Sequence, residues 1–194
     1  MSHYYSEKQE SDLNLRKIIN TVRGFQIELF LGSGIFSTKK IDNGSRLLAE
    51  KMVIKNNDKV LDLGCGAGVI GLIASKLTMN QIIMTDINER ACKLSRMNTR
   101  GIKNIKVKQG DIYEPVKNEM FDVVLLNPPQ TAGKKLCFEM IEKAKDHLNK
   151  GSNLQLVARH SKGGKHLSEK MEKIFGNVKA LAKKGGYRVY YSKK

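Results

Sequence analysis

Short apolar runs alternate with longer amphipathic stretches from residue 59 onward, and this rhythm constrains the fold more than any other feature of the chain. The runs are typical of buried strands, and the stretches between them are typical of helices. Strand–helix–strand repetition of this kind indicates a parallel sheet flanked by helices. The runs lie at residues 60–63, 82–84, 105–107, 123–126 and 154–158, and helices are expected at about 68–78, 88–99, 134–149 and 164–175.

The C-terminal part departs from the parallel pattern. Two further strand-like runs, at residues 177–183 and 187–192, are joined by Gly185-Gly186. A two-residue glycine link predicts an antiparallel hairpin. The predicted fold is therefore α/β, with a mostly parallel, seven-stranded sheet that closes with an antiparallel C-terminal hairpin.

The N-terminal part is expected to add a short extension made of strands and a helix. Residues 25–31 alternate apolar and polar side chains, which predicts a strand, and residues 35–37 are the expected return strand. A helix is predicted over residues 43–54, with Asn43 as its cap.

Length, charge and cysteine usage narrow the setting in which the chain works. The 194 residues contain no repeat or linker, so one domain over 1–194 is expected, with an extension over 1–55 and a core over 56–194. The 35 Lys+Arg against 19 Asp+Glu give a net charge of +16, which favours a polyanionic partner, most simply nucleic acid. No apolar stretch is long enough for a membrane span, and the polar N-terminus has no signal core. The three cysteines without a CxxC predict reduced thiols in the cytoplasm and no metal site. The protein is expected to be a monomer or a weak dimer.

A glycine-rich loop follows the first strand of the repetition. Residues 62–68 read Asp-Leu-Gly-Cys-Gly-Ala-Gly, which lets the backbone pass close to a ligand. A GxGxxG pattern that starts at Gly66, with Asp86 twenty residues later, would also suit NAD. In that case the strand would run through Gly64, which is a poor strand interior. Asp62 beside the loop suits an ammonium or sulfonium group better than a pyrophosphate, and S-adenosylmethionine carries both groups.

Residues 60–68 resemble motif I of the class I S-adenosylmethionine-dependent methyltransferases, which have a Rossmann-like fold. In that superfamily an acid after the second strand binds the ribose hydroxyls, and Asp86 falls at its position. Asp111 and Ile112, after the third run, match the positions that usually contact the adenine. The resemblance implies cofactor contacts from Asp62, Gly64, Gly66, Gly68, Asp86, Ile87, Asp111, Ile112 and Asn127.

The fourth strand ends in Asn127-Pro128-Pro129-Gln130, which resembles the (N/D)PP(Y/F) signature of methyltransferases acting on planar amine nitrogens. Such amines include exocyclic base amines and glutamine amides. The Asn127 oxygen and the Pro128 carbonyl can each accept one N–H, which would turn the nitrogen lone pair toward the methyl group. The two prolines make this segment stiff and place the acceptors in advance.

The match extends over nearly the whole chain. Segments such as 34–48 and 184–189 resemble the "methyltransferase small domain" family, and in particular its compact archaeal members. The family includes bacterial small-subunit rRNA guanine-N2 methyltransferases. Gln130 departs from the pattern, because many relatives carry Tyr or Phe there to stack on the target base. Phe36 or Phe138 is the aromatic residue expected to take that role.

The resemblance implies an N-methyltransferase that acts on the exocyclic base amine of an RNA, most simply guanine N2 in small-subunit rRNA. An adenine amine is the other base acceptor that the sequence leaves open. Charge supports this hypothesis, because residues 129–194 carry 16 Lys+Arg against 5 Asp+Glu. Lys134 and Lys135, at a predicted helix start, and Arg159 and Lys162, after the fifth strand, are expected to face RNA phosphates. The alternatives are a glutamine-amide protein methyltransferase, a nicotinamide oxidoreductase and a non-catalytic RNA-binding module.

Overall fold

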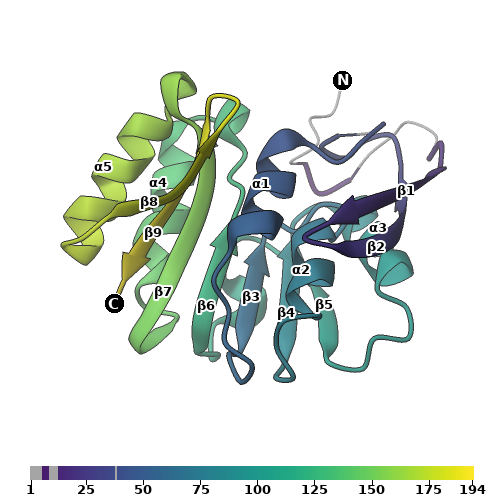
Figure 1. Cartoon of the computed structure of the whole chain (residues 1–194), viewed down its shortest axis with the longest axis horizontal. Coiled ribbons are helices and arrows are strands. Elements are labelled where there is room, and N and C mark those ends of the chain that lie inside the picture. Colours follow the sequence, from purple (N-terminus) through teal and green to yellow (C-terminus); the bar gives the residue numbers. More distant parts are fainter. Residues whose placement is uncertain (1–5, 9–12, 38) are drawn as a thin grey trace.

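One seven-stranded sheet forms the centre of the computed structural model, which describes residues 6–8, 13–37 and 39–194 (Figure 1). Its strands are β3 (Val60–Leu63), β4 (Ile82–Asp86), β5 (Ile105–Gln109), β6 (Phe121–Leu126), β7 (Leu148–Arg159), β8 (Lys179–Lys184) and β9 (Tyr187–Lys193). Their order across the sheet is β5-β4-β3-β6-β7-β9-β8. Strands β3 to β7 are parallel, and β9 lies antiparallel between β7 and β8. The predicted fold class is confirmed.

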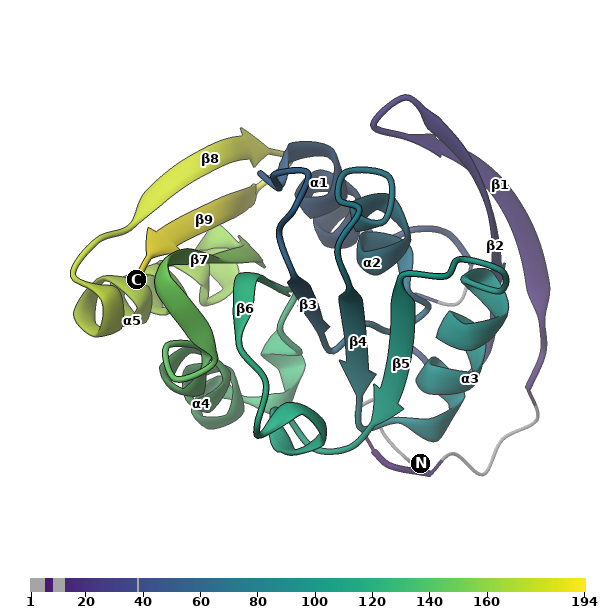
Figure 2. The same cartoon turned by 90° about the horizontal axis from the view of Figure 1, so that it is seen from below.

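Helices cover both faces of this sheet, as Figure 2 shows. The helices are α1 (Asn43–Lys51), α2 (Val69–Ala74), α3 (Glu89–Asn98), α4 (Lys134–Ala144) and α5 (Gly164–Phe175), with 3-10 turns η1 (Glu114–Val116), η2 (Gln130–Ala132) and η3 (His160–Lys162). Alternate strand residues go to opposite faces: Val60 packs in the core under α1 and α2, whereas Leu61 packs in the core under α4 and α5. Because both faces are buried, the strands have uninterrupted apolar runs. None of the helices in the described ranges is long and apolar enough to cross a membrane.

Several helix boundaries differ from the sequence-based expectation. Helices α2 and α4 end early, at Ala74 and Ala144, and β7 already begins at Leu148. Asn43 is not the cap of α1. Asp42 takes that role, because its carboxylate accepts a hydrogen bond from the Ser45 N–H at 2.9 Å.

The strand predicted at residues 25–31 pairs with the segment before it and not with the segment after it. β1 (Arg16–Val22) and β2 (Phe25–Leu31) form a separate antiparallel hairpin, so the return strand expected at 35–37 is wrong. The turn at Arg23-Gly24 has φ values of 51° and 81°. Two successive positive φ angles match the twist of a tight hairpin, which closes the ladder before residue 35 is reached.

Asn98 at the end of α3 fastens this hairpin to the glycine loop. Its Oδ1 accepts from the Phe30 N–H at 2.7 Å, and its Nδ2 donates to the Phe30 carbonyl at 2.9 Å. The same Nδ2 donates to the Ala67 carbonyl at 2.8 Å. One side chain therefore holds β2, α3 and the loop after β3 together.

We expect Asn98→Ala to lower the free energy of unfolding by roughly 2–3 kcal/mol, because three hydrogen bonds are lost and the Phe30 backbone groups lose their partner. Denaturant unfolding followed by circular dichroism measures this change. Asn118→Ala is the matched control, since this side chain is exposed. Equal stability of the two variants would contradict the anchoring role of Asn98.

Candidate active site

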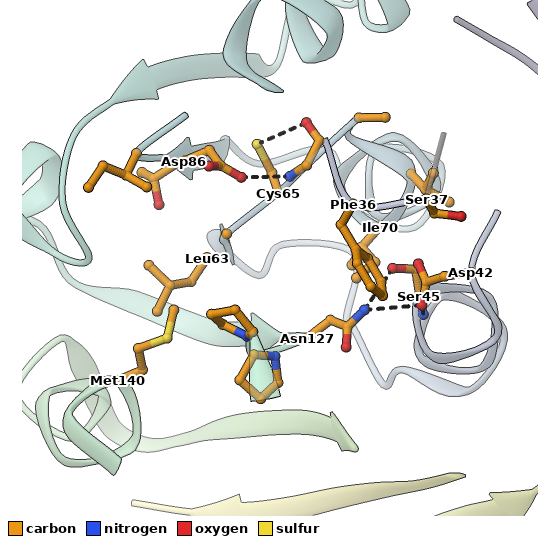
Figure 3. Close-up of a pocket in the computed structure, with 18 of the residues that line it drawn as sticks. Phe36, Ser37, Asp42, Ser45, Leu63, Cys65, Ile70, Asp86, Asn127 and Met140 are labelled. Carbon is orange, nitrogen blue, oxygen red and sulfur yellow. Dashed lines mark hydrogen bonds between the residues drawn. The ribbon is translucent and has the colours of Figure 1, made fainter. Parts of the chain in front are cut away.

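A cavity opens at the carboxyl ends of β3, β4 and β6 (Figure 3). In an open α/β sheet this edge is where ligands bind. The loop after β3 lines its middle, Asp86 and Asp111 line one end, and Asn127 lines the other. The cavity therefore brings most of the predicted cofactor residues and the Asn-Pro-Pro segment into one site.

The glycine loop takes a shape that only glycine adopts without strain. Gly64, Gly66 and Gly68 have φ values of 71°, 56° and 85°. A Cβ on Gly66 would meet no atom within 4 Å, so this position is open toward a ligand. Gly68 has a different role, because a Cβ there would lie 2.7 Å from Met84 Cε, and the residue does not line the cavity.

Asp86 presents a carboxylate that the backbone has already oriented. Its Oδ2 accepts from the Gly66 N–H at 2.9 Å, and its Oδ1 accepts from the Asn88 N–H at 2.9 Å. Burial raises the pKa of Asp86, while the N–H groups of Asn88, Gly66 and Ile87 act against that rise. Asn88, and not Asp86, caps α3. The carboxylate keeps lone-pair capacity that can accept from a ribose hydroxyl.

Three other residues predicted to bind the cofactor line the same end of the cavity. Ile87 follows Asp86 directly, and Asp111 and Ile112 follow β5. Ile112 has a φ of 42°, so the backbone turns sharply there. A paired acceptor at Asp86, apolar walls and the carboxylate of Asp111 fit the ribose and adenine of S-adenosylmethionine.

Asp62 does not line the cavity, contrary to the expectation from the sequence. It alternates with Leu61 and Leu63 along β3, so its side chain points toward α2 and is fully buried. Its Oδ2 accepts from the Gly71 N–H at 2.8 Å, whereas its Oδ1 has no partner. Burial above all raises the pKa of Asp62 to about 7, the Gly71 N–H lowers it, and the charge of Asp86 raises it further.

The amide of Asn127 is held by the first turn of α1 (Figure 3). Its Nδ2 donates to Ser45 Oγ at 3.0 Å and to Asp42 Oδ1 at 3.3 Å. Both amide protons are therefore used, and Oδ1 is left to accept a hydrogen bond from a ligand. Sequence reasoning missed Asp42 and Ser45 as functional residues; the Asp-x-x-Ser spacing of a helix cap is the signal that could have found them.

Pro128, Pro129 and Gln130 form a tight turn. Pro129 has φ −73° and ψ 78°, and the Gln130 N–H donates to the Pro128 carbonyl at 2.8 Å. These values describe an inverse γ-turn. The Pro128 carbonyl, predicted to accept a substrate N–H, thus already accepts one bond and has one lone pair left.

The Gln130 side chain does not enter the cavity. Its Nε2 donates to the Lys162 carbonyl at 2.9 Å, and its Oε1 accepts from the Arg159 N–H at 3.2 Å. Gln130 thereby ties the Asn-Pro-Pro turn to η3. This structural role explains why the residue need not be aromatic.

Of the two aromatic candidates, Phe36 belongs to the site and Phe138 does not. The Phe36 ring lines the cavity and is 45% exposed. Phe138 packs against the core between α4 and α5, and the Lys170 ammonium lies 5.3 Å from its ring centroid.

The four basic residues proposed to face RNA lie outside the cavity. Lys134 and Lys135 are exposed at the start of α4. Arg159 and Lys162 are exposed around η3. All four are thus accessible to a large partner and not to a ligand inside the cavity.

The three cysteine thiols are free and buried. Burial, followed by the charges of Asp86 and Asp62, raises the pKa of the Cys65 thiol, and burial raises those of Cys92 and Cys137 to about 11. All three thiols therefore stay protonated near neutral pH. Within residues 6–8, 13–37 and 39–194, no three His, Cys, Asp or Glu side chains are grouped to hold a metal ion.

Comparison with known proteins gives one family over most of the chain. The family model "Methyltransferase small domain" matches residues 26–191. The uncharacterized protein YbxB of Bacillus subtilis is 38% identical over 99% of this chain and 98% of its own length. The ribosomal RNA small subunit methyltransferase C of Haemophilus influenzae is 32% identical over 97% of this chain, which spans 58% of that relative.

Solved methyltransferase structures have the same fold as this chain. The T. thermophilus 16S rRNA N2 methyltransferase RsmC, in complex with AdoMet and guanosine, aligns with a TM-score of 0.79 and 20% identity. That alignment covers 96% of this chain and 52% of the other. A methyltransferase from Pyrococcus furiosus aligns with a TM-score of 0.67 and 26% identity, covering 77% of this chain and 81% of the other.

The buried carboxyl of Asp62 predicts a pH dependence of stability. Its pKa of about 7 in the folded chain lies above the ordinary value of 3.8, so the unfolded state ionises first as pH rises. Asp62 should therefore lower the free energy of unfolding progressively from about pH 4 to about pH 7, by at most about 1.4 kcal/mol per pH unit, with no further change above.

Denaturant unfolding of Asp62→Asn beside the unmodified protein, from pH 5 to pH 9, isolates this effect. The stability of the variant relative to the unmodified protein should rise up to about pH 7 and then level off. A difference in free energy of unfolding that is the same at every pH would reflect altered contacts alone. Such a result would contradict the ionisation of Asp62.

Proposed function

The chain belongs to the methyltransferase small domain family, and we propose that it methylates the exocyclic N2 amine of a guanine in small-subunit rRNA. It is a methyltransferase, as the sequence predicted, and the alternative of a nicotinamide oxidoreductase is set aside. One observation carries the proposal: a single cavity joins the paired acceptor of Asp86 to an Asn127 amide whose oxygen is free.

S-adenosylmethionine is the methyl donor and, when bound, supplies an electrophilic methyl group on its sulfonium. Asp86 would hold the ribose hydroxyls, with Asp111 and Ile112 beside the adenine. Gly64 and Gly66 allow the backbone to approach this ligand closely. These residues lie at the end of the cavity away from Asn127, so the acceptor amine belongs at the Asn127 end.

Asn127 prepares the acceptor nitrogen for attack. An aromatic amine is a weak nucleophile because its lone pair is delocalised into the ring. When Asn127 Oδ1 and the remaining lone pair of the Pro128 carbonyl each accept an N–H, the lone pair turns toward the methyl group. The same oxygens stabilise the positive charge that develops on nitrogen, and the proton leaves to solvent after transfer.

Hydrogen-bond polarity supports guanine over adenine. Asn127 Nδ2 is used by Asp42 and Ser45, so the amide offers the base an acceptor only. Asp42 lines the cavity, and among the described residues no hydrogen bond reaches its Oδ2. The pairing edge of guanine presents N–H donors at N1 and N2, which match these acceptors. Adenine would place its N1 acceptor against the carboxylate, which costs binding energy.

Charge and relatives support RNA as the substrate class. The net charge of +16 favours a polyanion, whereas a glutamine side chain on a protein requires no such charge. A glutamine amide would also leave Asp42 Oδ2 without a donor, since both of its N–H bonds go to Asn127 and Pro128 and it has no third N–H. The H. influenzae relative, by its name, acts on ribosomal RNA of the small subunit. Phe36 is the exposed ring that would stack on the target base.

We expect Asn127→Ala to slow methyl transfer at least a hundredfold while S-adenosylmethionine still binds with near-normal affinity. The lost acceptor acts mainly on the transition state, and removal of one oxyanion-hole donor from other enzymes lowers the rate about 10²–10³-fold.

Asp86→Ala should show the opposite pattern, with the affinity for S-adenosylmethionine at least tenfold weaker. Single-turnover methylation of small-subunit rRNA and calorimetry with the cofactor measure the two effects. Unaltered transfer by Asn127→Ala would overturn the amine-methylation proposal.

The Asp42→Asn variant tests base selection. Asparagine keeps the helix cap and the bond to Asn127, but it replaces the acceptor Oδ2 with a donor. Transfer to a guanine target should fall about tenfold to a hundredfold relative to an adenine target in the same RNA. Mass spectrometry of the methylated nucleosides gives this ratio.

Ser45→Ala is the matched control for base selection. It removes one support of Asn127 without altering Asp42 Oδ2, so it should slow both targets equally. An unchanged guanine-to-adenine ratio in Asp42→Asn would show that Asp42 only positions Asn127.

A further inference from the structure

Positive side chains gather around the turn between β8 and β9, outside the cavity. The turn is Gly185-Gly186, and it lies at the carboxyl end of β7, because Arg159 pairs with Tyr187 in the sheet. We call this region the hairpin surface and define it by Arg159, Lys162, Lys183, Lys184 and Arg188. We propose that the hairpin surface binds the phosphate backbone of the RNA beside the target base, an inference that rests on the proposed function.

The hairpin surface has a large uncompensated charge. Residues 147–194 contain twelve Lys+Arg and only two acids, Glu169 and Glu172. None of the five defining residues has an ion pair within the described part of the chain, and all of them except Arg188 are exposed. Lys165 is left out of the definition because it pairs with Glu169 at 3.9 Å. Free, exposed cations of this density suit a polyanion.

The surface is hollowed at its centre. His160, Ser161 and residues 183–188 line a depression of about 400 Å³. The two glycines have φ values of 56° and 78°, and a Cβ on either would meet nothing within 4 Å. A phosphate can thus approach bare backbone there, between the lysine side chains. Desolvation, and then the charges of Arg188, Lys165 and Lys183, lower the pKa of His160, which is consistent with a positive potential in the hollow.

Direct contacts join the hairpin surface to the active-site turn. Gln130 bonds to the backbone of both Arg159 and Lys162, and the His160 N–H donates to the Gly186 carbonyl at 2.9 Å. The surface is therefore fixed in position relative to the Asn-Pro-Pro turn.

Tyr187 makes a second connection. A Cβ on Gly44 would lie 3.2 Å from Tyr187 Cε1 and 3.3 Å from Asn127 Oδ1, so these residues share one corner of the site. On the other side, the Arg159 guanidinium lies 5.4 Å from the Tyr187 ring centroid. Figure 1 shows the β8–β9 turn at the same end of the molecule as α1. An RNA chain whose base reaches Asn127 would pass over this corner.

The chemistry of the surface favours RNA over a protein or a lipid bilayer. Large exposed apolar side chains of the described residues lie elsewhere, at Leu15, Ile19, Phe36, Val53, Met79 and Met120. The hairpin surface thus offers charge and open backbone without an apolar anchor. Such a surface suits phosphates, which are recognised by charge and N–H groups alone.

The double variant Lys183→Ala with Lys184→Ala tests this proposal in the full chain. Binding of a single-stranded fragment of small-subunit rRNA, measured by fluorescence anisotropy across salt concentrations, should weaken roughly 25-fold near 0.1 M salt. The slope of log K against log salt should become shallower by about 1.4, since each lost phosphate contact removes about 0.7. Cofactor affinity should not change.

Lys150→Ala with Lys193→Ala is the matched control. It removes the same charge from the opposite end of β7 and β9, where Lys193 pairs with Asn153. This variant should keep the unmodified salt slope and most of the affinity. Equal losses in both double variants would overturn the proposal, because they would reflect net charge alone.

Further outcomes distinguish a failure of the hairpin-surface proposal from a failure of the proposed function. If the Lys183/Lys184 variant binds bare rRNA normally but fails on assembled small subunits, the surface contacts a protein and the proposal is wrong. If the unmodified chain neither binds nor methylates rRNA, the proposed function itself fails. Methylation by the unmodified chain, together with normal RNA binding by the variant, would overturn the hairpin surface alone.

Discussion

The bonds between the start of α1 and the Asn127 amide fix which atom of that amide faces the cavity. An asparagine amide can present either a donor or an acceptor, and only its fixed partners decide which one faces the ligand. Here Asp42 and Ser45 take both amide protons. The N-terminal segment thus defines the chemical polarity of a residue that comes 85 positions after Asp42 in the chain. Asn98 in turn holds β2, α3 and the glycine loop together.

Burial disfavours the charged form of both Asp86 and Asp62, but their backbone hydrogen bonds offset this cost to different extents. Asp86 receives backbone N–H groups on both oxygens, so it remains a usable acceptor at the cavity. Asp62 receives one N–H and keeps an unpartnered oxygen in the core. Desolvation raises the pKa of both carboxyl groups, and Asp86 receives more N–H groups that lower it again than Asp62 does. Of these two acids on neighbouring strands, Asp86 therefore presents its carboxylate to the cavity, and Asp62 supports the loop framework.

The repeating strands and the glycine loop were predictable from the sequence because each is a local pattern. The apolar runs located all seven strands of the main sheet, and the left-handed glycines occur where the loop was expected. Contacts between distant segments were not predictable. Nothing in residues 25–31 indicates that their partner precedes them, and the proline signature does not show that Gln130 reaches η3. Asp62 was misplaced for a related reason: sequence proximity to a loop does not tell which face of a strand a side chain takes.

The position of β9 between β7 and β8 has a consequence for how the site comes into being during folding. Strand β8 bonds only to β9, whereas β9 bonds to both neighbours. The β8–β9 ladder is local and can zip early, but its docking on β7 closes a contact across α5 and is slower. Tyr187 comes to lie beside Gly44 only after that docking step. A folding intermediate in which β9 has not yet docked on β7 could already contain the formed glycine loop. It would still lack the corner of Tyr187, Gly44 and Asn127 over which the RNA is proposed to pass. The ability to bind S-adenosylmethionine would therefore arise before the ability to bind RNA.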